Sequence, residues 1–417
     1  MAQLTNDCFA TGDRLMPLED ALELIETRVS CTVGTETIPA FDADGRVLAE
    51  NVVAGLNLPP FDNSAVDGYA VRFADLLPRG DTVLPVVGRI AAGGAPDAAQ
   101  PGTAVRIFTG APMPPGFDTV FMQEDVVSEP GGRARLPAGL KPGANRRTAG
   151  EDVAVGSSVM QAGLRLRPAD LALLGALGCT TVAVRKTLRV ALLSTGDEVA
   201  QPGTPLRPGQ LYDANRPMLA ALLRRAGCAV NDLGILPDRR EAVREALARA
   251  GDGHDLILTT GGVSTGEEDH VRAALEETGA LTFWRIGIKP GRPVAMGVAS
   301  GTPFMGLPGN PAAAFVTFAF LGRALVARLS GERRLSPVPV SVSTGFSYKK
   351  KAGRREYVRV RLERDDAGAV VARKHPREGA GIIASLTETD GLVEIGEAVT
   401  RIEPGDRVGF HSYASLY

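Results

Sequence analysis

The sequence predicts a multidomain protein in which a central three-layer α/β domain with a mostly parallel sheet is flanked by β-rich domains. From residue 188 onward, strands that are apolar throughout alternate with helical patterns, as in a sheet covered on both faces. Short alternating runs punctuated by Gly and Pro lie on either side of this segment, and the chain holds 49 Gly and 29 Pro. Its 417 residues correspond to two to four domains at ~100–200 residues each.

The N-terminal domain is expected to be small and discontinuous. Residues 17–29 carry apolar side chains at helical spacing after a proline, which predicts a helix. A second helix is expected from Pro168 to Gly178, followed by a strand in TTVAVRK. We expect this second segment to pack back on the N-terminal helix.

A β-rich insertion is expected from the runs AVDGYAVR, TVLPVVGRI, TAVRIF and DTVFMQEDVV. A C-terminal, barrel-like β domain is expected from VPVSVST, EYVRVRLE, AVVAR, GLVEI and DRVGF. The molecule is expected to be elongated. The predicted N-terminal domain is discontinuous, at residues 15–50 with 146–187, and the inserted β-rich domain lies at residues 51–145. The α/β domain is predicted at residues 188–331 and the C-terminal β domain at residues 332–417.

Composition narrows the class of protein. The net charge is −2, so no basic excess supports nucleic-acid binding. The four cysteines form no C-x-x-C pair and the four histidines have no ligand-like spacing, which favours a reduced, cytoplasmic protein without a structural zinc site. We expect no signal peptide and no membrane span.

Three strands of the α/β segment end in loops of similar composition: STGDEV, TTGGVSTGEEDH and GLPGNPAA. Ligands of open α/β sheets bind beyond the carboxyl ends of the strands, and glycine lets backbone N–H groups approach an anion. Ordinary βα turns are the alternative. The residues expected to hold a phosphate-bearing ligand are Thr195, Gly196, Gly261, Gly262, Ser264, Pro308, Gly309, Asn310 and Pro311.

Three acids lie in or beside these loops. Glu198 and Asp269 follow the first two loops, and Asp238 starts a helix. Carboxylates beside phosphate-binding loops commonly hold Mg²⁺. Helix capping is the alternative for Asp238 and Asp269.

The turn IGIKPGRP offers two cations, Lys289 and Arg292, which suit an anion. A solvated hairpin is the alternative.

The β-rich insertion has its own polar motifs. LPPFDNSAVDGYAVR places Asp62 among turn-forming residues, and IFTGAPMPPG holds Thr109 in a turn rich in proline. In RRTAGEDV we expect Arg146 and Arg147 to pair with Glu151 and Asp152, as a binding element or as a salt-bridged turn.

Seven motifs in this order, PPFDNSAVDGYAV, TGAPMPPG, AGEDV, STGDEV, TTGGVSTGEEDH, IKPGRP and GLPGNPAA, resemble the molybdopterin molybdenumtransferase family, which includes bacterial MoeA and the gephyrin E-domain. The resemblance runs from about residue 15 to the C-terminus. It implies an enzyme that inserts molybdenum from molybdate into adenylylated molybdopterin and releases AMP, with Mg²⁺. It also implies an L-shaped homodimer with a cleft shared between subunits, and contact with other proteins of molybdenum cofactor biosynthesis.

The same resemblance assigns roles to individual residues. Glu198 and Asp269 match acids of the nucleotide and metal part of the cleft, and Asp238 matches more loosely. Pro308 and Pro311 match a rigid turn near the molybdate region, and Lys289 matches a basic turn. The positions that match the partner-facing side are Asp62, Thr109 and Asp152.

The sequence departs from the family pattern at Arg285 and Arg292, where lysine is common. Arginine keeps the charge and changes its geometry. Two other functions stay open on the residues alone, namely a molybdopterin adenylyltransferase and a non-catalytic cofactor-binding scaffold. Tungstate is the alternative to molybdate.

Overall fold

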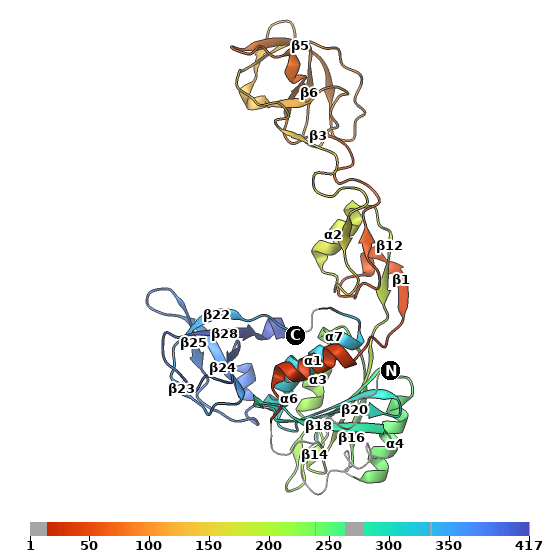
Figure 1. Cartoon of the computed structure of the whole chain (residues 1–417), viewed down its shortest axis with the longest axis vertical. Helices are drawn as coiled ribbons and strands as arrows, with labels where there is room; N and C mark the ends of the chain where they lie inside the picture. The colour runs from red at the N-terminus through yellow and green to blue at the C-terminus, as the bar shows by residue number, and fades with distance from the viewer. Residues whose placement is uncertain (1–14, 238, 263–278, 334–335, 417) are drawn as a thin grey trace.

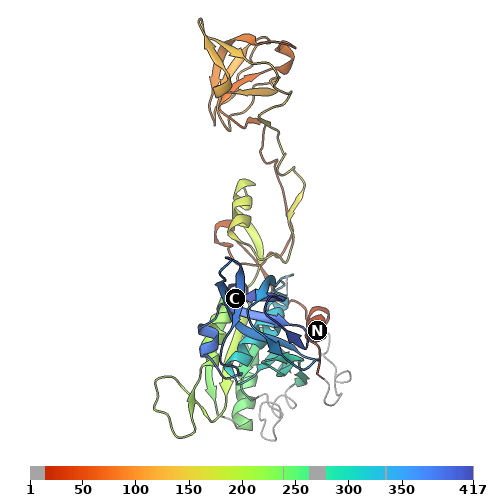
Figure 2. The same ribbon diagram turned by 90° about the vertical axis from the view of Figure 1, so that its left-hand side faces the viewer.

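The computed structural model describes residues 15–237, 239–262, 279–333 and 336–416. The molecule is elongated, with four regions along the chain (Figures 1 and 2). The α/β region comprises residues 18–28 and 188–329, and the barrel comprises residues 340–412. A narrow stalk, residues 35–54 and 153–185, connects the α/β region to a β-rich tip, residues 63–147.

A six-stranded sheet lies at the centre of the α/β region, in the order β16-β13-β17-β21-β20-β18. Its strands are β13 (Arg189–Thr195), β16 (Ala229–Leu236), β17 (Leu256–Thr260), β18 (Gly279–Arg285), β20 (Pro293–Ala299) and β21 (Thr302–Leu307). The pairs that join β16, β13, β17 and β21 are parallel, which confirms the mostly parallel sheet.

Strand β20 runs antiparallel to both of its neighbours, and the sequence did not predict it. Only two residues, Ser300 and Gly301, separate β20 from β21, and a connection this short can join only antiparallel strands. The predicted strand LTFWRIGI is divided as well. It ends as β18 at Arg285, and Ile288–Lys289 form a separate strand, β19, which pairs with the barrel.

Two hydrophobic cores cover the two faces of the sheet, because successive strand residues point in opposite directions. Val190 and Leu192 of β13 join the core under one set of helices, and Ala191 and Leu193 join the opposite core. The helices on the first face are α1 (Leu18–Arg28), α3 (Asn215–Arg225), α6 (Pro311–Thr317) and α7 (Arg323–Leu329). On the second face, α4 (Arg240–Gly251) contributes Val243, Leu247 and Ala250.

A π-helical segment, Phe318–Gly322, joins α6 to α7 into one apolar helix. Among the described residues this is the one helix long and apolar enough to span a membrane, with 19 residues and a mean hydropathy of 1.6. Because 89% of its apolar window is buried inside the protein, it acts as a core helix. Phe320 of the π segment stacks on Tyr357 of the barrel at 4.0 Å between ring centroids, so this helix also anchors the barrel.

The stalk is built from segments far apart in the sequence. Strand β1 (Thr35–Pro39) pairs with β12 (Thr181–Arg185), and β2 (Val52–Val53) pairs with β11 (Ser158–Met160), both antiparallel. Helix α2 (Pro168–Ala176) packs on them through Leu174.

The expectation that this returning segment packs on the N-terminal helix is wrong. Helix α1 lies against α7 instead, and its Leu18, Ala21 and Ile25 belong to the α/β core. The physical reason is that the core of the stalk is already closed by residues 38–52, so that the apolar face of α1 is left for the large sheet domain.

The tip and the barrel confirm the predicted β-rich regions. In the tip, β4 (Gly68–Val71), β5 (Thr82–Ile90), β6 (Ala104–Ile107), β7 (Thr119–Met122), β8 (Val127–Glu129) and β9 (Arg133–Leu136) form one sheet in the order β7-β4-β6-β5-β9-β8, beside the small pair β3 (Asn63–Ser64) and β10 (Arg146–Arg147).

The C-terminal strands are β22 (Val340–Thr344), β24 (Arg355–Arg364), β25 (Val370–Lys374), β26 (Gly391–Ile395) and β28 (Arg407–Ser412). Pairing of β24 with both β25 and β26 closes these strands into a barrel.

Candidate functional site

The three glycine-rich loops converge at one edge of the central sheet. Ser194 lies in register with Thr260, and Thr260 lies in register with Leu307, so the carboxyl ends of β13, β17 and β21 are level. Beyond them lies a cleft of about 840 Å³, lined by residues of all three loops and by Ala380, Gly381 and Ile383 of the barrel region. The described residues that the sequence assigned to ligand binding in these loops all line it, apart from Gly196: Thr195, Gly261, Gly262, Pro308, Gly309, Asn310 and Pro311.

Glycine is required at Gly261 by both conformation and space. Its φ is +83°, and a Cβ there would lie 2.4 Å from the carbonyl oxygen of Thr195. Gly196, with φ +135°, lies behind Glu198, because a Cβ would be 2.6 Å from a carboxylate oxygen of that side chain. Gly261 therefore allows the first two loops to approach each other closely, and Gly196 leaves room for the Glu198 carboxylate within the first loop.

Asn215, at the start of α3, ties two of the loops together. Its Nδ2 donates to Thr260 Oγ1 at 2.8 Å and to the Gly309 carbonyl at 2.7 Å. Thr260 Oγ1 in turn donates to the Pro308 carbonyl at 3.1 Å. The loop that carries the two prolines is thus fixed to the end of β17 by buried side chains.

A buried network of hydrogen bonds and ion pairs around Asp213 connects the end of β13 to the start of α3. Asp213, whose side chain is 2% exposed, accepts hydrogen bonds from Ser194 Oγ at 2.6 Å and from Arg216 Nε at 3.0 Å. It also accepts the backbone N–H groups at the start of α3, at 3.1 and 3.0 Å. Burial lowers the pKa of Arg216, but its bonds to Asp232 and Asp213 outweigh burial and hold that pKa above its ordinary value.

Two buried polar atoms in the cleft wall lack a hydrogen-bond partner among the described residues. They are Thr195 Oγ1 and Asn215 Oδ1, on side chains that are 1% and 6% exposed. Unpaired buried acceptors are costly, and in native proteins they commonly mark a place for water or a ligand. Glu198 lines the same cleft and is exposed, so a carboxylate is available there.

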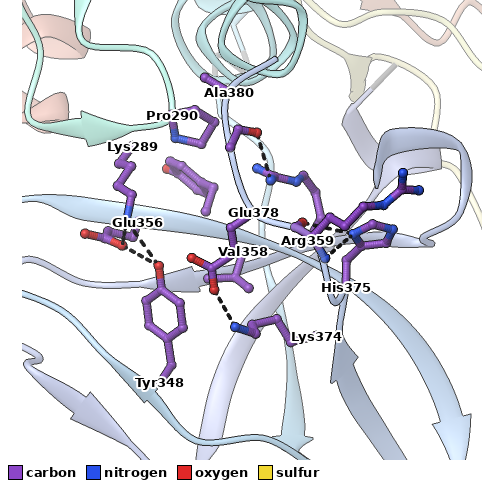
Figure 3. Close-up of a pocket in the computed structure, with 13 residues that line it drawn as sticks. Lys289, Pro290, Tyr348, Glu356, Val358, Arg359, Lys374, His375, Glu378 and Ala380 are labelled. Carbon is purple, nitrogen blue, oxygen red and sulfur yellow. Dashed lines mark hydrogen bonds and ion pairs between the residues drawn. The ribbon is translucent and has the colours of Figure 1, made fainter. Parts of the chain in front are cut away.

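Lys289 lies in a second, smaller cavity of about 150 Å³ between β19 and the barrel (Figure 3). Its Nζ bonds to Glu356 at 3.0 Å and to the Tyr348 hydroxyl at 3.3 Å. Burial, followed by the hydrogen bond to Glu356, raises the pKa of Tyr348 above its ordinary value, so this phenol stays protonated.

Sequence reasoning missed three cations that line this cavity with Lys289, namely Arg359, Lys374 and Arg377, and Arg359 is the buried one. The side chain is buried, its Nη2 donates to the Gly379 carbonyl at 3.1 Å, and its Nε has no hydrogen-bond partner within the described part of the chain. Nothing in EYVRVRLE distinguishes the buried Arg359 from the exposed Arg361, because both alternate with valines of the barrel core. The segment that carries Gly379 lies against Arg359 and comes from elsewhere in the chain.

The sequence suggested one anion site around Lys289 and Arg292, and the structure separates them. Lys289 lines the small cavity, whereas Arg292 lines the large cleft. The intervening turn reverses the chain, so that its two ends face different spaces. The two spaces adjoin at Ala380, which lines both and whose carbonyl accepts the Ala312 N–H at 2.9 Å.

The tip lies at the opposite end of the molecule from the α/β region (Figure 1), and no residue of the tip lines the cleft of the same chain. Asp62 accepts the Ala149 N–H at 2.8 Å and pairs with Arg146 at 3.4 Å. The predicted pairing of Arg146 and Arg147 with Glu151 and Asp152 is therefore wrong for Arg146, because strand β10 pairs with β3 and turns this arginine toward Asp62.

The exposed Glu151 side chain instead accepts the Thr148 N–H at 2.9 Å. Asp152 is exposed, and its backbone N–H donates to the carbonyl of Leu58, four residues before Asp62.

Thr109 is held by Asp67, an acid that the sequence did not assign. Asp67 Oδ1 accepts the Thr109 N–H at 2.8 Å and its hydroxyl at 2.7 Å. The backbone and side-chain hydrogen bonds from Thr109 lower the pKa of Asp67.

Three family models match the sequence in order. The MoeA N-terminal region (domain I and II) matches residues 16–178, a probable molybdopterin binding domain matches residues 191–328, and the MoeA C-terminal region (domain IV) matches residues 341–413. A Haemophilus influenzae protein named molybdopterin molybdenumtransferase is 38% identical over 401 residues, which cover 94% of this chain and 98% of that relative. The chain belongs to the MoeA family.

A second relative and a solved structure agree with this assignment. Molybdopterin molybdenumtransferase 2 of Mycobacterium tuberculosis is 37% identical, covering 89% of this chain and 93% of its own length. The crystal structure of the molybdopterin biosynthesis moeA protein from Pyrococcus horikoshii OT3 has a TM-score of 0.80 at 30% identity, covering 96% of this chain and all (100%) of that one. The resemblance to this family read from the seven motifs is confirmed.

Three candidate residues lie outside the described residues of this MoeA family member: Asp238, Ser264 and Asp269. Among the side chains that are described, no group of three or more His, Cys, Asp or Glu could hold a metal ion. Sequence reasoning also missed Asp213 and Asn215. The signal for them was present in LYDANRP, where Asp and Asn stand at the start of a helix beside the strand ends.

Proposed function

We propose that this chain is a molybdopterin molybdenumtransferase, which inserts molybdenum from molybdate into adenylylated molybdopterin and releases AMP. The observation that carries the proposal is a large cleft that adjoins a small, cation-lined cavity at Ala380 and has buried polar atoms without a partner among the described residues. A bulky pterin nucleotide and a small oxyanion need two such adjoining spaces. The names and high coverage of the MoeA relatives support the same activity.

The large cleft is proposed to hold the pterin nucleotide. Its volume of about 840 Å³ lies within the range of ~300–1,000 Å³ typical of small-molecule sites. Backbone groups around Gly261 and Gly309 can approach a phosphate closely, and Arg292 lines the same space as a counter-charge. Asn215 Oδ1 and Thr195 Oγ1 have no partner among the described residues, so they can bond to polar groups of the substrate.

The oxygen donors of the cleft fit Mg²⁺. Glu198 presents an exposed carboxylate, and Thr195 presents a hydroxyl without a partner among described residues. A bound Mg²⁺ would offset the charge that develops on the cleaved phosphoryl group. Asp269 and Asp238 are proposed as further ligands on the sequence motif.

The small cavity is proposed to hold molybdate. Among its lining residues are four Lys or Arg, which outnumber Glu356 and Glu378. Glu356 and the protonated Tyr348 orient the ammonium of Lys289. The buried guanidinium of Arg359 retains an N–H with no partner in the described ranges. A tetrahedral dianion supplies acceptors for both cations. Tungstate has the same shape and charge, so competition between the two oxyanions is expected.

The main experiment measures AMP release from adenylylated molybdopterin with molybdate and Mg²⁺. Glu198→Gln should lower the rate on the order of 100-fold, because the neutral amide is a poor Mg²⁺ ligand. Glu241→Gln on the surface of α4 is the matched control and should react as wild type. Equal rates for Glu198→Gln and wild type would remove this acid from the mechanism.

Two further readouts separate the alternatives. An adenylyltransferase would consume ATP in the presence of molybdopterin, whereas the proposed enzyme would not. A scaffold protein would leave cofactor synthesis unchanged when its gene is deleted, whereas deletion of this enzyme should abolish it unless molybdate is supplied in excess.

The enzyme is proposed to act as a homodimer in which the tip of one subunit completes the cleft of the other. The support is the separation of the tip from the α/β region in Figure 1, combined with motif residues Asp62, Thr109 and Asp152, which lie in or directly beside the tip. A cytoplasmic location and contact with other proteins of molybdenum cofactor biosynthesis complete the proposal.

Subunit mixing tests the shared cleft. Asp62→Asn keeps a hydrogen-bond acceptor for Ala149 and removes only the charge, so the variant should fold and lose activity. Mixed with Glu198→Gln, it should regain about a quarter of wild-type activity, because half of the randomly formed dimers contain one intact cleft. No recovery in a sample shown to contain mixed dimers would mean that each cleft is built within one chain.

A further inference from the structure

A third cavity lies where the stalk meets the α/β region, and the proposed reaction does not use it. It measures about 280 Å³, and six of its thirteen lining residues are Arg or Lys, whereas only one, Asp44, is acidic. The cations are Arg46, Arg165, Arg185, Lys186, Arg224 and Arg225. Because the whole chain has a net charge of −2, this is a local concentration of positive charge.

The six cations come from both sides of the junction. Arg224 and Arg225 occupy the last turn of α3, where basic side chains also stabilise the negative end of the helix dipole. The other four belong to the stalk or to the segment that leaves it, and no helix end accounts for them. Like charges gathered from separate elements repel one another, so their convergence on a cavity needs another explanation.

Internal partners satisfy only part of this charge. Arg46 pairs with Glu36, and Arg165 pairs with Glu332 at 2.7 Å and donates to the Gly45 carbonyl at 2.7 Å. Neither of these two glutamates lines the cavity. The Nε of Arg185 is buried and has no hydrogen-bond partner in the described part of the chain.

One residue that lines the cavity, Gly227, needs to be a glycine. Gly227 has a φ of +80°, and a Cβ there would lie 2.7 Å from a guanidinium nitrogen of Arg165. A larger residue would therefore displace an arginine that lines the space.

We propose that this cavity binds a small molecule bearing two phosphate groups. Guanidinium groups bind phosphate oxygens in pairs, and several cations on opposite walls match two anionic groups better than one. A volume of about 280 Å³ is near the lower end of ligand sites, which suits a bisphosphate and leaves little room for a folded peptide.

Occupation would couple the stalk to the body of the enzyme. The segment from Arg185 to Leu188 joins β12 of the stalk to β13 of the central sheet and forms one wall of the cavity. An anion bound to stalk cations and to the end of α3 bridges the junction, fixes the direction of the stalk and so positions the tip. The cavity is thus a regulatory site, separate from the cleft.

Pyrophosphate is the probe, and isothermal titration calorimetry measures its affinity. In the doubly substituted protein Arg185→Gln with Lys186→Gln, affinity should fall on the order of tenfold or more, because two charge-assisted contacts are lost. The doubly substituted protein Arg244→Gln with Arg249→Gln, which changes two exposed arginines of α4, is the charge-matched control and should bind as wild type. Unchanged affinity in the Arg185 and Lys186 variant would overturn the proposal.

Pyrophosphate could also enter the large cleft, so every titration is repeated with Asn310→Ala, which alters the cleft alone. The loss caused by the Arg185 and Lys186 substitutions should persist in that background. If only Asn310→Ala weakens binding, pyrophosphate occupies the cleft and the cavity is not a phosphate site.

Chemical modification gives a readout that does not depend on folding of a variant. Acetylation of exposed Lys186 in the native protein should slow severalfold when pyrophosphate is added, whereas acetylation of Lys141 in the tip should not change. Equal acetylation of Lys186 with and without pyrophosphate would contradict the site.

Discussion

The cleft and the tip are made from similar sequence, rich in Gly, Pro, Asp and Thr, and they use their polar groups differently. In the tip, the carboxylates of Asp62 and Asp67 are already bonded to backbone N–H groups of Ala149 and Thr109. In the cleft, Thr195 Oγ1 and Asn215 Oδ1 are buried and have no partner among the described residues. The cleft therefore has buried polar groups that can still bond to a ligand, whereas the hydrogen bonds of the tip fix its shape for recognition by another surface.

The largest effect is expected at Asp213, which supports the cleft from inside the core. Asp213→Ala removes the acceptor of Ser194, of Arg216 and of two backbone N–H groups. Since the side chain is 2% exposed, the free energy of unfolding should fall by about 3–5 kcal/mol. Urea unfolding measures this, with exposed Asp252→Ala as the control.

A loss below about 1 kcal/mol for Asp213→Ala would show that the network is dispensable and that the cleft is no better supported than the tip.

An intermediate effect is expected from Gly261→Ala. The new Cβ would meet the Thr195 carbonyl oxygen at 2.4 Å in a backbone with φ +83°. The unfolding free energy should fall by about 3 kcal/mol, through left-handed strain plus the clash.

Gly209 is the matched control for this substitution. Its φ is +85°, and a Cβ there would meet nothing within 4 Å. Gly209→Ala should cost only the strain, about 1 kcal/mol. Equal losses for the two variants would mean that the close approach of the loops contributes nothing beyond backbone conformation.

The smallest effect is expected in the tip and depends on pH. The hydrogen bonds from Thr109 lower the pKa of Asp67 in the folded protein below its unfolded value of ~3.9. Their contribution to stability is therefore fully present above the unfolded pKa and is lost as pH falls through the folded pKa. The Thr109 amide resonance should titrate below pH ~3.9 in NMR spectra, and Asp67→Asn should abolish that titration.

A Thr109 resonance that titrates above the ordinary carboxyl range would contradict the hydrogen bonds between Thr109 and Asp67. The polar groups of the tip would then be no more fixed than those of the cleft.

Sequence reasoning identified the cleft because its signals are local. Glycine and proline at strand ends restrict the backbone directly, so the residue pattern alone assigns STGDEV, TTGGVSTGEEDH and GLPGNPAA to one sheet edge. The parallel strands follow from the alternation of apolar runs with helices. The sequence did not predict the antiparallel strand β20, because an apolar run does not indicate the direction of a strand.

What the sequence by itself determined is the family, the architecture and the loops that surround the cleft. Only the tertiary structure decided that Lys289 and Arg292 face different cavities, that Arg359 is buried beside the cavity of Lys289 and that α1 packs on the large sheet. It also decided that six cations from the stalk and α3 converge on one cavity. The reason is physical: local sequence fixes backbone conformation, whereas the direction and partners of a side chain depend on elements far away along the chain.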